Sequence, residues 1–200
     1  MKPDEFTSWR DLTKPQWKEK LVIGRDPMLA GYGRAMFTFF YMKQELGPDF
    51  ITQVLKQNPK ILRDDHTGAQ WLGEGKYPVC FCSDIEINPM IDAGLPIAMV
   101  DPRKLQEATH ATSAYANVML ANRAPHPNAA KVYVNWVLSQ EGGASFSKAG
   151  GVPSLRVDVG MEGIDPKLVP DPSWPVTNTE AGLNIEEQKL VPLLRQTLGS

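Results

Sequence analysis

Residues 21–24 read Leu21-Val22-Ile23-Gly24, a short apolar run that ends at a glycine. A run of this length, rich in β-branched residues and bounded by a turn former, predicts a buried β-strand. Asp26-Pro27 breaks the chain next, and apolar residues then recur at helical spacing. The stretch therefore predicts the first strand–helix unit of the chain, and the fold class depends on whether such units follow one another.

The alternation continues along the first half of the chain. Helices are predicted over residues 29–46, 50–57, 67–73 and 88–93, strands over 77–83 and 95–100, and an extended piece over 60–63. This order favours an α/β sheet with helices on both faces. The second half predicts a strand over residues 113–120, helices over 127–138, 139–150 and 185–198, and irregular chain over 152–184.

The amino-acid composition limits the classes of protein to which the chain can belong. The chain has 200 residues, of which 42% are hydrophobic and 22% charged, as in ordinary globular domains. Its 21 basic and 23 acidic residues give a net charge of −2, so nothing points to nucleic acid. The longest apolar runs are too short to cross a bilayer, and the first residues lack the apolar core of a signal peptide.

The two cysteines, Cys80 and Cys82, lie one residue apart in a predicted strand. Both side chains should point to the same face, and the spacing is too short for an easy unstrained disulfide. We therefore expect two small core residues, with a reactive thiol as the alternative.

Two segments follow predicted strands, where α/β lobes bind ligands. The first runs from Asp26 to Arg34. In it Gly31, Tyr32 and Gly33 would present backbone N–H groups and an aromatic ring to a polar ligand, and Arg34 would supply charge. The alternative is that the glycines only shape a loop and that Arg34 is solvated. The glycine spacing does not make a dinucleotide fingerprint.

The second segment follows residues 77–82 and contains Ser83, Asp84 and Glu86. These side chains can hydrogen-bond an organic ligand, and two carboxylates favour a cationic one, such as a polyamine or a thiamine-like compound. The alternative is a helix N-cap formed by Asp84. The three histidines are scattered, and no catalytic constellation is recognisable, because spacing along the sequence cannot place such groups in space. No metal site or cofactor is expected.

Three groups of residues resemble one known family. They are the arm DLTKPQWKEK at residues 11–20 with the strand after it, the run Gly94–Asp101 with Pro102, and the segment from Ala124 through Asn135-Trp136 to Arg156–Val159. In this order they are similar to bacterial extracellular solute-binding proteins of ABC transporters, of the ferric- and polyamine-type branch.

The resemblance implies a type II periplasmic-binding-protein fold, with two α/β lobes that close on a solute and present it to the membrane subunits of an ABC transporter. It places the protein in the periplasm or outside the cell, with no enzymatic activity. Ferric-binding relatives carry a Tyr-Tyr pair where this chain has Ile85-Glu86, so the resemblance implies an organic solute rather than iron.

The resemblance also implies a division of the chain. Residues 1–19 are expected to be a connecting arm, 20–98 a complete second lobe, and 99–200 the crossover and C-terminal helices of a first lobe that lacks its N-terminal part. Such a chain would expose an apolar helix face around Trp136, so a homodimer or a domain swap is expected.

Two other functions remain open. One is a small α/β hydrolase or transferase that uses Asp84 or Asp26 as an acid–base group. The other is a degenerate lobe with a purely structural or interaction role. A binding protein should show ligand-dependent stabilisation without turnover.

Overall fold

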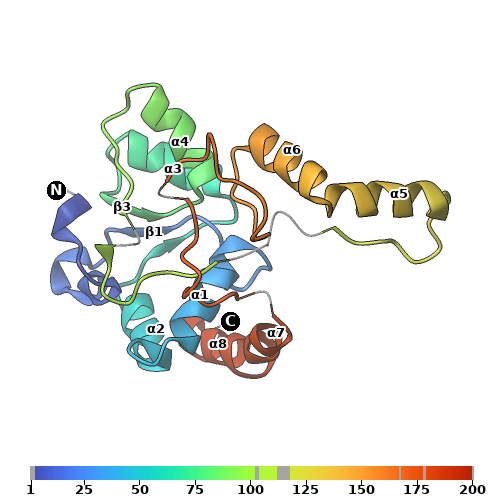
Figure 1. Ribbon diagram of the computed structural model, residues 1–200. Coiled ribbons are helices and arrows are strands. Elements are labelled where there is room, and N and C mark those ends of the chain that lie inside the picture. The colour runs from blue at the N-terminus through green and yellow to red at the C-terminus, as the bar shows by residue number, and fades with distance from the viewer. Residues whose placement is uncertain (1–2, 102–103, 112–117, 167, 178, 200) are drawn as a thin grey trace. The chain divides into compact units, whose positions relative to one another are not determined.

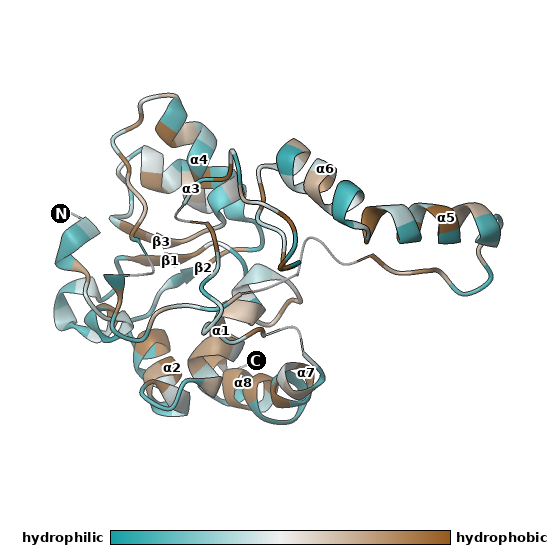
Figure 2. Ribbon diagram, viewed as in Figure 1, coloured by the Kyte–Doolittle hydropathy of each residue, from teal (hydrophilic) through white to brown (hydrophobic). Residues whose placement is uncertain are grey.

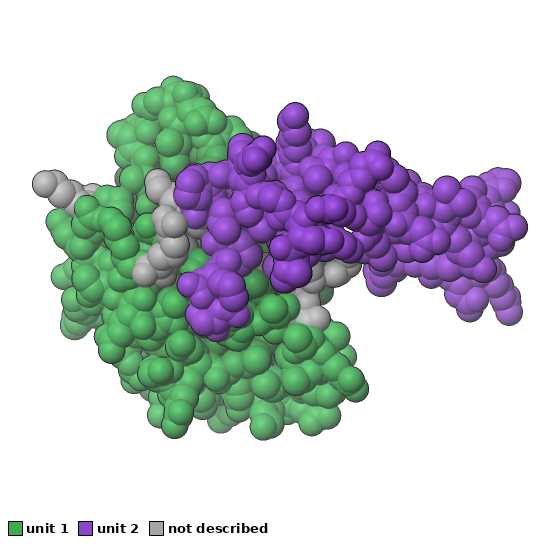
Figure 3. All heavy atoms as spheres, viewed as in Figure 1, with its two compact units in different colours: residues 1–114, 174–200 green, residues 115–173 purple. Residues whose placement is uncertain are grey.

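A computed structural model describes residues 3–101, 104–111, 118–166, 168–177 and 179–199. The chain forms two compact units (Figure 3). The first comprises residues 1–114 and 174–200, and the second comprises residues 115–173. This division is based on which residues pack together. It differs from the predicted one, because residues 174–200 belong to the first unit. The assignment of the chain to two lobes stays a prediction.

A parallel three-stranded sheet forms the centre of the first unit, with strand order β2-β1-β3. The strands are β1 (Leu21–Ile23), β2 (Lys60–Ile61) and β3 (Val79–Phe81). Val22 pairs with both Lys60 and Cys80, and the strands β1 and β3 are apolar (Figure 2). The mixed helices and small parallel sheet agree with the predicted α/β class.

Helices cover both faces of this sheet (Figure 1). On one side lie α3 (Asp65–Gly73) and α4 (Asp84–Asp92), and on the other lie α1 (Tyr32–Met42) and α2 (Gly47–Lys56). Side chains alternate along β3, so Phe81 faces α1 and α2 while Cys80 and Cys82 face α3.

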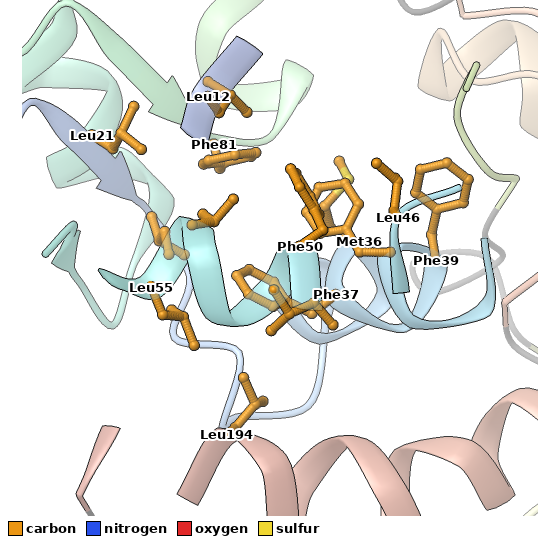
Figure 4. Packing of buried hydrophobic residues seen from close by; sticks show 14 of the residues in the cluster. Leu12, Leu21, Met36, Phe37, Phe39, Leu46, Phe50, Leu55, Phe81 and Leu194 are labelled. Atoms are coloured by element: carbon orange, nitrogen blue, oxygen red, sulfur yellow. The ribbon is translucent and has the colours of Figure 1, made fainter. Parts of the chain in front are cut away.

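The main core lies on the α1 and α2 side. Phe40 is fully buried there, with its ring 5.0 Å from that of Phe50 and 6.2 Å from that of Phe81. Leu194 from the C-terminal helix and Leu12 from the N-terminal arm complete it (Figure 4). Burial of these large apolar side chains is the main favourable term in the stability of this unit.

The N-terminal arm is part of the core and does more than connect. It contains 3-10 helices over Pro3–Glu5, Trp9–Thr13 and Pro15–Trp17. Trp17 stacks on Phe6, and the buried carboxylate of Glu107 accepts hydrogen bonds from the Ser8 hydroxyl and the Trp9 backbone N–H.

The predicted strand over residues 95–100 is wrong. These residues form no strand and are partly exposed, and the third strand of the sheet is β2 instead. Pro96 lacks the N–H group that a central strand must donate. Of the predicted strand over residues 113–120, residues 113–117 lie outside the described part of the chain, and 118–120 have no strand structure.

The last helix begins earlier than predicted and contains a π-helical turn. It consists of α7 (Glu180–Ile185), the π turn Glu186–Leu190 and α8 (Val191–Leu198). Pro192 has no N–H to donate within a regular helix, and π turns commonly accommodate such positions.

Cys80 and Cys82 are joined in a disulfide, which corrects the expectation of two unpaired core residues. Their Cα atoms are 5.4 Å apart, inside the range that disulfides span. Both side chains lie on the same face of the strand, as the spacing predicts, and this brings the two sulfurs together.

The second unit contains α5 (Pro127–Val137) and α6 (Gln140–Gly150), both close to their predicted bounds. Ser139 caps α6, and Gly151 ends it in the left-handed conformation, with φ 61°. Arg156 holds the following loop by donating to the carbonyl of Leu138 and to Asp158. Across the described residues, no helix is both long enough and apolar enough to span a membrane.

Candidate ligand-binding site

The carboxyl ends of the three strands meet at one edge of the sheet, because the strands are parallel. Two hydrogen bonds link the segments that leave this edge: Gly24 N donates to Phe81 O at 2.9 Å, and Asp26 N donates to Leu62 O at 2.7 Å. Helices α1, α3 and α4 follow β1, β2 and β3. This edge is where α/β domains bind ligands.

The first predicted segment forms the loop between β1 and α1, and its polar side chains bind that loop. Asp26 Oδ1 accepts from the backbone N–H of Met28 at 2.8 Å. The Arg34 guanidinium donates to the carbonyl of Pro27 at 3.2 Å and also to that of Met28. These contacts stabilise the loop, and a direct role of Asp26 or Arg34 in ligand binding stays a prediction.

Between them lie the two glycines and Tyr32. Gly31 has a φ of 127°, which side chains rarely adopt, and it precedes the first residue of α1. At Gly33 a Cβ atom would overlap the carbonyl of Arg25, so the helix can approach the loop only without a side chain there. Tyr32 is partly buried and packs against the main core. The glycines therefore have a structural role here, whatever their role toward a ligand.

The second predicted segment lies where β3 leads into α4. Ser83 is buried, and its hydroxyl is 3.4 Å from Asp84 Oδ1. Asp84 is the first residue of α4, and the backbone N–H groups of Glu86 and Ile87 donate to the Ser83 carbonyl. Glu86 Oε2 lies 3.0 Å from Nδ1 of His66 at the start of α3. The structure thus brings this segment together with α3.

Sequence reasoning missed Asp65 and His66, which enter the site from α3. Asp64 caps this helix by accepting from the Thr67 N–H at 2.8 Å, and that hydrogen bond lowers the pKa of Asp64. Asp65 is half-buried, and its Oδ1 has no hydrogen-bond partner among the described residues. Burial raises the pKa of Asp65; the charge of Glu86 adds to this rise and that of Arg25 opposes it.

A signal for these residues was present in the sequence. Asp64-Asp65-His66 follows the extended piece at residues 60–63, so the rule applied to the other two strands also points to it. The prediction began the helix at residue 67 and left the triplet in a connecting loop. The structure begins α3 at Asp65.

The charge balance of the edge is acidic. Asp65, Asp84 and Glu86 lie on neighbouring elements, and Arg25 is the basic residue whose charge acts on Asp65. Within the described ranges, no group of three or more His, Cys, Asp or Glu side chains could hold a metal ion. A small hollow in the N-terminal arm, lined by residues such as Asp11 and Trp17, contains none of the candidate residues.

The carboxyl edge of a parallel α/β sheet, with helix N-termini around it, is a common place for α/β domains to bind small molecules. Residues 1–151 match the family model of bacterial extracellular solute-binding proteins, and the chain belongs to this family. A search of curated proteins found no match.

Membership gives the function in outline. These proteins bind small-molecule solutes for transport, work outside the cytoplasm and are in general not enzymes. The Cys80–Cys82 disulfide agrees with an oxidising compartment.

Proposed function

We propose that the protein is the substrate-binding component of an ABC importer and captures a small organic cation, not iron, at the carboxyl edge of the sheet. The observation that carries this proposal is the position of Asp65 at the start of α3 and of Asp84 and Glu86 at the start of α4, two helices that contact each other. Carboxylates in a partly buried setting attract an ammonium group more strongly than they would in water.

The residues at this edge favour an organic cation and disfavour iron. Ser83 contributes a hydroxyl and Asp65 a half-buried carboxylate, groups that can accept hydrogen bonds from a ligand ammonium as well as attract it. Iron is disfavoured because Fe³⁺ needs several oxygen ligands, and Ile85-Glu86 replaces the phenolate pair of ferric-binding relatives.

Thermal unfolding with defined probes tests the proposal. We expect spermidine or thiamine to raise the unfolding midpoint by about 5–10 °C at a hundred times the dissociation constant, because a ligand that binds only the folded chain stabilises it. Citrate and ferric citrate should leave the midpoint unchanged.

Variants test whether the shift in the unfolding midpoint depends on the acidic residues of the candidate site. Asp65→Asn and Glu86→Gln should each remove most of the shift, whereas Glu45→Gln, an exposed carboxylate just beyond the end of α1, should keep it. A shift with ferric citrate alone, or no shift with any organic cation, contradicts the proposal. Turnover of a substrate that is lost in Asp84→Asn would favour the enzyme instead.

A further inference from the structure

The Cys80–Cys82 disulfide lies directly beneath α3. A Cβ atom placed on Gly68 of α3 would lie 2.9 Å from Cys82 Sγ and 3.1 Å from Cys80 Sγ. On the other side, a Cβ atom on Gly24 would lie 3.1 Å from Cys82 Sγ. A side chain at either position would collide with the sulfurs, so both glycines are needed for the chain to pack beside the disulfide.

This crosslink contributes little to the stability of the fold. It spans a single residue, so it removes little conformational entropy from the unfolded chain. The hydrogen-bond ladder with β1 already fixes the register of β3, because Leu21, Val22 and Ile23 pair with Val79, Cys80 and Phe81.

The disulfide lies close to the acidic edge, because the same two glycines are near both. Gly68 lies one helical turn after Asp65, on the same helix. Gly24 touches both features, since its Cβ atom would lie 2.6 Å from Asp65 Oδ1. Bonded sulfurs are about 2 Å apart, whereas unbonded atoms of this size need at least ~3.5 Å. Reduction therefore moves the sulfurs apart by roughly 1.5 Å, next to two positions, Gly68 and Gly24, where the chain leaves no room for a Cβ atom.

We propose that Cys80 and Cys82 form a redox-active pair that displaces the first turn of α3 when it is reduced by a dithiol. A thiolate of the dithiol attacks one sulfur and forms a mixed disulfide, and its second thiol then resolves this bond. The protein gains two electrons and two protons, and the dithiol leaves as its own disulfide. Both cysteines are partly exposed, which gives the attacking thiolate access. The proposal does not depend on which solute the protein binds.

Alkylation tests the pair under native conditions. The purified chain is treated with iodoacetamide before and after dithiothreitol, and its intact mass is measured. We expect no adduct before reduction and two adducts after it. Adducts on both cysteines without reductant, or none after native reduction, would overturn the proposal.

Hydrogen exchange tests the displacement in the same two samples. Reduction should raise amide exchange at least about threefold in a peptide covering the start of α3, and leave a peptide from α2 unchanged. The double variant Cys80→Ser/Cys82→Ser should not respond to dithiothreitol. If that variant does not fold, the oxidised and reduced wild-type samples still decide the matter: equal exchange in α3 would refute the displacement.

Discussion

At the scale of single residues, His110 couples stability to pH. Its ring stacks on Phe39 at 5.4 Å, and neither ring nitrogen has a hydrogen-bond partner among the described residues. Burial lowers the pKa of His110 from 6.5 to about 4, so the folded chain keeps the ring neutral. The unfolded chain takes up a proton as the pH falls below 6.5, and the folded chain does so only near 4. The free energy of unfolding should therefore fall across this window, by at most roughly 3 kcal/mol.

His110→Phe should flatten this dependence, because phenylalanine keeps the stacking and has no group to protonate. The measurement is urea unfolding at pH 7, 5.5 and 4.5. His126→Gln, at an exposed position, is the control and should retain the wild-type slope. A His110→Phe variant with the wild-type slope would show that other groups carry the pH dependence.

Asp65 has the opposite relation to pH. Because its pKa is raised, the folded chain holds this proton more tightly than the unfolded chain does. Its contribution to stability is thus unfavourable at neutral pH and disappears as the pH falls through the raised pKa. We expect Asp65→Asn to raise the thermal midpoint at pH 7 and to match wild type in acid. Glu45→Gln should show no such convergence. A destabilised Asp65→Asn at pH 7 would contradict this account.

At the scale of elements, the approach of α1 to the β1–α1 loop depends on Gly33. The Cβ atom of Gly33→Ala would overlap the backbone carbonyl of Arg25, which cannot move without displacing β1. We expect a loss of about 1–3 kcal/mol in the free energy of unfolding, measured in urea. Gly160→Ala is the matched control, since no atom lies within 4 Å of its added Cβ. Equal stability of the two variants would show that the loop adapts.

The sequence predicted helices and strands well where a segment had one clear hydrophobic pattern. The helix over residues 127–138 was visible from its apolar stripe and Pro127, and β1 from its apolar run. The failures involve partners distant in sequence. The run 95–100 has the composition of a strand, but strand formation needs a neighbour, Pro96 cannot donate a hydrogen bond to one, and the run forms no strand. The disulfide was missed for a local reason, because the spacing of Cys80 and Cys82 alone does not give the 5.4 Å between their Cα atoms.

The candidate site shows the same limit. Ser83, Asp84 and Glu86 were found because they follow a clear strand, and Asp65 was missed because β2 has only two residues. That Asp26 and Arg34 are engaged by their own loop could not be read from the sequence. Their hydrogen bonds to Pro27 and Met28 depend on the loop conformation that Gly31 and Gly33 permit.

At the scale of the whole molecule, the exposed stripe on α5 predicts self-association. Val132, Tyr133 and Trp136 are 70%, 56% and 41% exposed and carry no charge, so the same stripe on a second copy can cover them symmetrically. We expect light scattering after size exclusion to give twice the 22.2 kDa chain mass at high concentration, and Trp136→Lys to shift the protein to monomer. Val157→Lys makes a similar change at a fully exposed site in the same unit and should leave the dimer intact. A wild-type monomer at every concentration would refute this prediction, whereas a dimer that survives Trp136→Lys would favour a domain swap.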